Sequence, residues 1–190
     1  MKKKTKSKTK AKPKAKSRAS QKSSGDVIQL ILKDHLPIKK LIEILKDADA
    51  KISEKRPALE KFIPTLLAHA KAEEETLYVH MKEESDELRA EGFEGNTEHA
   101  LAEQLIEEIK NTRDEDEWMA KVKVLAELVE HHVEEEEGEM FKEIRKEFDL
   151  EKREEIGEEY TRLLARHKID LQDDSRSKNK RSNSETEKFI

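Results

Sequence analysis

Apolar residues return every three to four positions through most of the chain, and polar residues fill the places between them. In the first such segment, Ile28, Leu32, Ile38 and Ile42 share one face if the backbone is helical. This spacing is typical of an amphipathic helix that packs one side against a core. With Asp26 as its capping residue, the pattern predicts a helix that ends at about residue 48.

Three further long segments show the same period, and none alternates in the manner of a β-strand. The predicted helices cover residues 57–84, 97–110 and 115–148, with a polar, glycine-containing stretch before the second of these. A shorter amphipathic segment at 151–167 predicts a fifth helix. Because the connections are short, successive helices are expected to be antiparallel. The sequence therefore predicts an all-α fold, an up-and-down four-helix bundle with a short fifth helix and disordered tails.

The charge is divided unevenly between the two ends of the chain. Residues 1–25 hold ten Lys, one Arg and no acidic residue, so the net charge of −5 becomes −16 for the rest once these +11 are set aside. Such low-complexity composition cannot bury a core. The predicted divisions are a disordered Lys-rich tail at 1–25, the bundle at 26–167 and a disordered polar tail at 168–190. The basic tail is expected to attract nucleic acid or another polyanion, or else to act as a solubilising tail or to dock on the acidic body.

The sequence lacks cysteine and long apolar segments, and both facts limit the kinds of site and location that it can have. The chain has no cysteine, which excludes disulfides, iron–sulfur clusters and thiolate zinc sites. No apolar run approaches the ~20 residues of a transmembrane helix, and no apolar segment of signal-peptide type follows the N-terminus. We expect a cytoplasmic protein, in which any metal site is built from His, Asp and Glu.

Histidines on the fourth predicted helix give the first sign of such a site. At about 100° per residue, His132 and Glu136 fall within the apolar stripe that includes Val122 and Val129, whereas His131 falls on its flank. One histidine and one glutamate, a turn apart, are therefore predicted to face the core.

The same device occurs 63 residues earlier, where HAKAEEETLY precedes its counterpart HHVEEEEGEMF. His69 and Glu73 take the places of His132 and Glu136 on an equally apolar face. Tyr78 and the corresponding Phe141 lie off the centre of the stripe, and we expect them to pack against neighbouring helices. The adjoining glutamates, Glu74 among them, are expected to form a solvated face.

The remaining two helices each aim one histidine inward. His35 lies among the apolar residues of the first helix, and His99 shares a face with Ile106 of the third. Glu103 follows His99 by one turn on nearly the same face, which leaves it open between a ligand and a structural residue.

A metal explains this convergence better than packing does. A single inward histidine is usually a satisfied core residue, but here each of four helices supplies one and two add a glutamate. Buried carboxylates cost several kcal/mol unless they are paired or bound to a cation. Imidazole and carboxylate ligands without thiolate suit iron. The candidate metal ligands are His35, His69, Glu73, His99, Glu103, His132 and Glu136.

These residues carry a family resemblance. The segments KDHLPIKKLI, LLAHAKAEEETLY, TEHALAEQL and LAELVEHHVEEEEGEMF resemble the hemerythrin-like, or HHE cation-binding, domain over residues 26–150. The resemblance implies a four-helix bundle with a non-haem centre of two iron ions. It also implies ligation by His35, His69, Glu73, His99, His132 and Glu136, with the two glutamates as bridging carboxylates.

The sequence departs from the oxygen-carrying hemerythrins at two positions. Glu103 stands where they have a second histidine on the third helix, and Glu137 stands where they have the last carboxylate, an Asp. A more carboxylate-rich site stabilises higher oxidation states of iron, which argues against reversible oxygen carriage. Binding or sensing of oxygen, peroxide, nitric oxide or iron remains, as a small ligand at the iron centre.

Three alternatives accompany that expectation. The first, a ferritin-like site, requires Glu three residues before its histidines, and Leu32, Leu66, Asn96 and Val129 stand there instead. The second is a di-iron enzyme that acts on peroxide or nitric oxide. The third is a nucleic-acid-associated scaffold that uses the basic tail.

Overall fold

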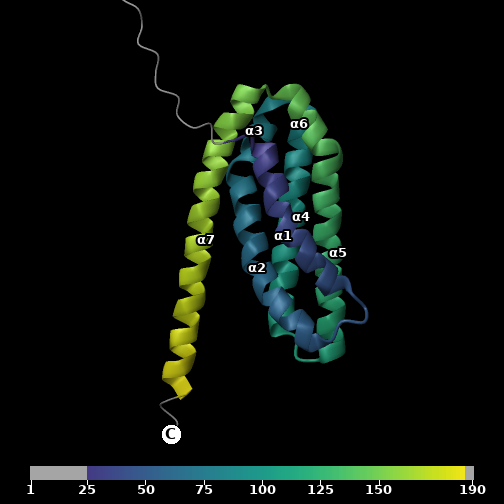
Figure 1. Cartoon of the computed structure of the whole chain (residues 1–190), viewed down its shortest axis with the longest axis vertical. Helices are drawn as coiled ribbons and strands as arrows, with labels where there is room; N and C mark the ends of the chain where they lie inside the picture. The colour runs from purple at the N-terminus through teal and green to yellow at the C-terminus, as the bar shows by residue number, and fades with distance from the viewer. Residues whose placement is uncertain (1–24, 187–190) are drawn as a thin grey trace, which may run out of the picture.

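The computed structural model describes residues 25–186, with side chains as far as Asp173, and this part of the chain is helical without any strand. The long helices are α1 (Val27–Lys46), α2 (Ile52–Glu75), α4 (Asp86–Asn111), α5 (Glu115–Glu135) and α7 (Leu150–Thr186). Short segments α3 (Leu77–Glu84), η1 (Glu136–Met140) and α6 (Phe141–Glu147) extend α2 and α5. Figure 1 shows α1, α2, α4 and α5 side by side, with α7 running along their outside. The all-α prediction is confirmed.

The helix starts follow from capping side chains. The Asp26 carboxylate accepts a hydrogen bond from the Ile28 N–H, and the Asp114 carboxylate accepts one from the Glu117 N–H. The Ser85 hydroxyl likewise accepts from the Leu88 N–H, which starts α4. Each cap satisfies a backbone donor that would otherwise lack a partner. The predicted starts of the first and fourth helices are accordingly correct.

Two predicted boundaries are wrong. The second helix begins at Ile52 rather than near Pro57, because the Lys51 N–H is already capped by the Glu54 carboxylate. The stretch 85–96, predicted as a connection, is the first part of α4. Its Gly95 is needed for close packing, because a Cβ there would lie 2.8 Å from the Tyr78 ring.

The two helices that carry the repeat are irregular at the same place. Thr76 breaks the helix between α2 and α3, three residues after Glu73. In the other copy, a π-helical turn begins at Glu136 itself. Such local irregularities often occur at functional sites. The predicted continuous helix 57–84 is therefore interrupted shortly after its inward glutamate, and the predicted helix 115–148 is interrupted at its own.

The apolar interior is divided into two clusters. One includes Ile38, Phe62 and Trp118, and the other includes Ile31, Tyr78 and Phe148. On α1, α2 and α4 the inward histidine lies between residues of the first cluster and residues of the second. On α5, His132 lies at the end of the first cluster, beside Val133, and the second cluster begins at Met140. The histidines therefore form a polar layer across the interior, with an apolar core on either side.

The fifth helix is longer than predicted. We expected 151–167 with a disordered end from 168, but α7 is helical to Thr186. It packs against α1 and α2 and buries Ile156 and Tyr160 completely. The Lys-rich tail, apart from Gly25, lies outside the described residues, so its disorder and its partners stay predictions. None of the described helices has the length and apolarity needed to cross a membrane.

Candidate metal centre

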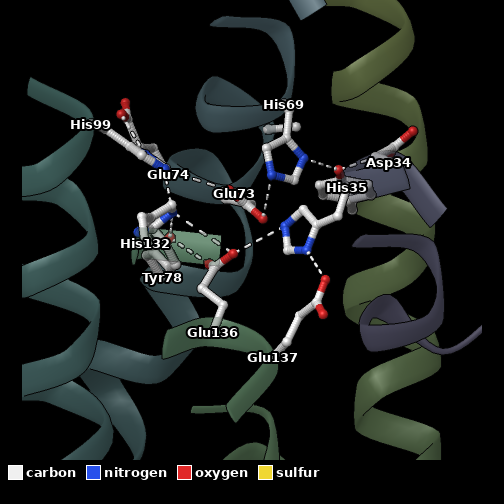
Figure 2. Close-up of polar contacts among 12 residues, drawn as sticks. Asp34, His35, His69, Glu73, Glu74, Tyr78, His99, His132, Glu136 and Glu137 are labelled. Atoms are coloured by element: carbon white, nitrogen blue, oxygen red, sulfur yellow. Dashed lines mark hydrogen bonds and ion pairs between the residues drawn. The ribbon is translucent and has the colours of Figure 1, made fainter. Parts of the chain in front are cut away.

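The structure brings six of the predicted ligands together in the polar layer (Figure 2). His35 comes from α1, His69 and Glu73 from α2, His99 from α4, His132 from the end of α5, and Glu136 from the π-helical turn. None of the six is more than 4% exposed. The helical period therefore placed all six correctly in the interior.

The two carboxylates lie between the histidines. Glu73 places Oε1 3.2 Å from His69 Nε2 and Oε2 3.6 Å from His99 Nε2. Glu136 places Oε2 3.2 Å from His35 Nε2 and 3.7 Å from His132 Nε2. Each carboxylate thus reaches one histidine of the α1–α2 pair and one of the α4–α5 pair.

Two groups of donor atoms result, and they share one residue. His35, His69, Glu73 and Glu136 form the first group, and Glu73, His99 and His132 form the second. Within each group all donor atoms lie within 4.8 Å of one another. This arrangement can hold two cations side by side, with Glu73 common to both.

The outer nitrogens of the four imidazoles are all hydrogen-bonded. His35 Nδ1 lies 2.9 Å from Glu137, His99 Nδ1 lies 3.1 Å from Glu74, and His132 Nδ1 lies 2.6 Å from Glu98. A carboxylate can only accept, so each of these Nδ1 atoms carries a proton and Nε2 is the nitrogen that faces the interior. His69 Nδ1 instead faces the Tyr160 hydroxyl at 2.9 Å. Hydrogen bonds to the outer nitrogen are the usual support of metal-binding histidines.

Tyr78 also belongs to the site. Its hydroxyl donates to Glu136 Oε1 at 2.7 Å, and its ring stacks on His99 with 5.5 Å between the ring centroids. We expected Tyr78 only to pack against neighbouring helices, so this contact corrects that prediction.

Without a cation the charges of this layer are poorly balanced. Burial, and then the nearby charge of Glu136, raises the pKa of Glu73 well above its usual value. Burial opposes ionisation of Glu136 too, but His132 and His35 hold its pKa well below the usual range. The same surroundings therefore favour the neutral form of Glu73 and the charged form of Glu136.

The histidines differ as well. Burial, aided by His35, lowers the pKa of His69, and burial also lowers that of His99. Burial acts in the same direction on His132, but Glu136 and Glu98 outweigh it and raise its pKa. His69 and His99 are therefore neutral imidazoles, the form that binds metals.

Unpaired atoms show that the layer fits a metal. His35 Nε2, His69 Nε2, both oxygens of Glu73 and Glu136 Oε2 are buried without a hydrogen-bond partner. His99 Nε2 and His132 Nε2, by contrast, lie within hydrogen-bond distance of each other, at 3.0 Å. Buried polar atoms without partners are costly. Cations held by the two donor groups would give these unpaired atoms a partner.

Glu103 is not brought to the centre. Its side chain is 40% exposed, and Oε1 lies 2.7 Å from Lys71 Nζ. One turn after His99 is already the edge of the inward face, as Lys39 shows one turn after His35, where it is 41% exposed. His131, predicted on the flank of the apolar stripe, is exposed and pairs with Glu135.

The sequence reasoning missed the residues that support the ligands. Glu74 and Glu137 immediately follow the two inward glutamates, and Glu98 immediately precedes His99. Glu74, expected on a solvated face, bonds His99 across the helix pair instead. Adjacency to a ligand is a signal for these carboxylates, whereas nothing near Tyr160 in the sequence points to His69.

A family model described as the hemerythrin HHE cation-binding domain matches residues 26–144. The chain belongs to this family. No curated protein and no solved structure matches the chain. All six converging candidate ligands of this hemerythrin-like chain lie inside the matched range, whereas Tyr160 and the whole of α7 lie beyond it.

Proposed function

We propose that the protein is a non-haem di-iron protein that binds or senses oxygen, peroxide, nitric oxide or iron. The observation that carries this proposal is the common orientation of the four histidines. Each outer nitrogen is hydrogen-bonded, and each Nε2 faces a buried carboxylate oxygen. We interpret the helices as the predicted up-and-down four-helix bundle, and a cytoplasmic location is part of the same proposal.

The six converging residues are the proposed ligands. His35, His69, Glu73 and Glu136 would hold one ion, and Glu73, His99 and His132 the other. Nitrogen and carboxylate donors without thiolate favour iron among the common redox metals. Iron supplies the capacity to bind small ligands and to change oxidation state, and the protein supplies a dry, preorganised set of donors.

A small cavity supports a small ligand at the second group. It has a volume of about 10 Å³ and lies against His99 and His132. Leu66, Ala102 and Val129 contribute to its largely apolar lining. About 10–15 Å³ is enough for one water-sized molecule, which suits a diatomic molecule better than any larger substrate.

Metal analysis of the purified full-length protein tests the proposal. Protein produced with iron supplied should contain two irons per chain by elemental analysis and show charge-transfer absorption in the near ultraviolet. A His131→Ala protein is the matched control, because His131 is exposed and should leave the iron content unchanged. Iron-free wild-type protein from iron-supplemented cells contradicts the proposal.

An enzyme acting on peroxide or nitric oxide is the second candidate. It is favoured by Tyr78, whose buried hydroxyl donates to Glu136 inside the site. Burial and the nearby Glu136 raise the pKa of Tyr78, so it retains its proton there. Steady turnover of peroxide or nitric oxide that disappears in a Glu73→Ala protein supports this candidate, and ligand binding without turnover eliminates it.

The proposal that residues 1–25 bind nucleic acid rests only on the sequence of this segment, which contains ten lysines. Such binding should weaken steeply with salt. The full-length protein should retard DNA at low salt, and protein lacking residues 1–25 should not. If the full-length protein does not retard DNA at all, this role is excluded.

A further inference from the structure

Tyr160 connects α7 to the metal centre. The residue is fully buried, although it lies on the helix that follows the matched family range. Its hydroxyl donates to Asp34 Oδ2 at 2.9 Å and lies 2.9 Å from His69 Nδ1. The contacts join residues 126 and 91 positions apart in the chain. One side chain of α7 thus contacts both α1 and the ligand-bearing α2.

The hydroxyl determines which nitrogen of His69 carries the proton. A tyrosine holds its single proton at neutral pH, and here it donates that proton to Asp34. The oxygen can then only accept, so His69 Nδ1 must be the donor. His69 Nε2 is left with its lone pair towards Glu73, 3.2 Å away. Asp34 and Tyr160 together hold the imidazole in its ligating form.

The same part of α7 is fitted closely to the start of α1. Arg153 Nε donates to the Asp26 carboxylate at 3.0 Å, and Asp26 is the cap of α1. A Cβ on Gly157 would lie 2.2 Å from the Gly25 carbonyl oxygen, so only glycine allows this approach. Further along, His167 Nε2 lies 3.2 Å from Glu75. Tyr160 lies between these contacts, where α7 is held against the bundle.

We propose that α7 is a working part of the metal centre, with Tyr160 as the positioning residue of His69, so that iron loading and the docking of α7 stabilise each other. The inference rests on the proposed function. Through the docking of α7, the presence or absence of metal in the centre would then alter the outer surface of the protein.

Because of this geometry, metal binding and the docking of α7 must affect each other. When α7 leaves, His69 Nδ1–H loses its acceptor inside a buried site, and the ligating form is no longer favoured. Loss of such an outer hydrogen bond typically weakens metal binding by about 10–100-fold. By linkage, the metal must favour docked α7 by the same factor.

A first experiment compares Tyr160→Phe with wild type in Fe(II) competition against a chelator. The substitution keeps the ring that fills the core and removes only the hydroxyl. We expect affinity for the more weakly held iron to fall by about 10–100-fold. Glu158→Gln, an exposed change on the same helix, should leave the affinity unchanged. Equal affinities in Tyr160→Phe and wild type overturn the positioning role.

A second experiment measures the docking of α7 directly. Amide hydrogen exchange is followed in the full-length protein, metal-free and loaded with Fe(II) without oxygen. We expect iron to slow exchange around residues 156–164 in wild type and in Glu158→Gln, and to slow it much less in Tyr160→Phe. Bound iron with unchanged exchange in α7 overturns the coupling but leaves the metal function intact. Absence of bound iron in wild type overturns both.

Discussion

The centre has two halves that repeat each other, one on α1 and α2 and the other on α4 and α5. His35, His69 and Glu73 in the first half correspond to His99, His132 and Glu136 in the second. The candidate ligands are alike, but the groups that support them are not. His132 is bonded directly to Glu98 at 2.6 Å, whereas Asp34, the counterpart of Glu98, reaches His69 only through Tyr160.

The aromatic residues differ in the same way. Tyr78 stacks on His99 and donates its hydroxyl to Glu136, while its counterpart Phe141 stacks on His35 without a polar group. The cavity also lies against His99 and His132, whereas α7 packs against the first half. Under the proposed function, the second half would receive the small ligand beside the cavity, and the first half would be supported by α7. Equal ligands can therefore serve unequal roles when their surroundings differ.

The largest effect is expected at the residue common to both donor groups. Glu73→Gln removes the charge that both ions share, so bound iron should fall to near zero by elemental analysis. In the metal-free state the variant should be no less stable to urea than wild type, because the Glu73 carboxyl is buried there with neither oxygen paired. Glu103→Gln, outside the centre, should retain all its iron. Full iron content in Glu73→Gln would show that the halves do not depend on a shared carboxylate.

The next largest effect should distinguish Glu98, which supports His132 directly, from Asp34, which supports His69 through Tyr160. Glu98→Gln removes a charge in direct contact with His132 and should weaken iron binding by about 10–100-fold. Asp34→Asn should have a smaller effect, since Tyr160 stands between it and His69. Chelator competition measures both. If Asp34→Asn is the more damaging change, the difference between the halves has been assigned the wrong way round.

A substitution in the cavity tests the binding of a small molecule separately from the binding of iron. Ala102→Leu should fill it and weaken nitric oxide binding by about tenfold, or about 1.4 kcal/mol. Iron content should stay the same, because Ala102 carries no donor atom. Ala58→Leu adds the same bulk to the apolar cluster away from this cavity and serves as the control. Spectroscopic titration of the ferrous protein with nitric oxide would disprove the role of the cavity if Ala102→Leu binds as wild type does.

Proton release should accompany metal uptake. The pKa of Glu73 is raised by burial and by Glu136, and that of His132 is raised by Glu136 and Glu98 against the effect of burial. Both groups therefore keep a proton to higher pH in the metal-free protein, and the metal must displace it. Affinity should rise as pH increases through these raised pKa values, by about tenfold per pH unit for each proton displaced. Calorimetry in buffers of different ionisation enthalpy counts the protons, and uptake without release contradicts the assignment.

The smallest effect on metal binding is expected from making the halves alike. Tyr78→Phe copies Phe141 and removes one hydrogen bond to Glu136, whose Oε2 still faces the donors. Loss of a hydrogen bond to a charged group costs about 1.5–3 kcal/mol, which urea unfolding of the metal-free protein measures. Iron content should not change. Loss of iron in Tyr78→Phe would place Tyr78 among the groups that hold the metal.

The helical period was sufficient to find the six converging residues, because an angle of about 100° per residue decides which side of a single helix faces inward. It failed at Glu103, which lies at the edge of that face. Comparison with Lys39, at the same place after His35, would have corrected this. A lysine there indicates a position near solvent rather than a ligand.

The supports were harder to predict because they depend on how helices pack against each other. Glu74 supports His99 and Glu137 supports His35, each across to another helix. Tyr160 needs the docking of α7 on α1 and α2, which no period within α7 reveals. The break at Thr76 and the π-helical turn at Glu136 were not predicted either, because each interrupts the regular helix over only a few residues.

The position of the histidine layer between two apolar clusters has a consequence for cooperativity. The two apolar clusters are separated by a layer of polar groups. Without a cation in that layer, the two ends of the molecule are expected to unfold in separate transitions. Iron would join them into one unit. Calorimetry should then show a single sharp transition for the loaded protein and two broader ones for the stripped protein, and a single transition in both would show that the ends are already joined by other contacts.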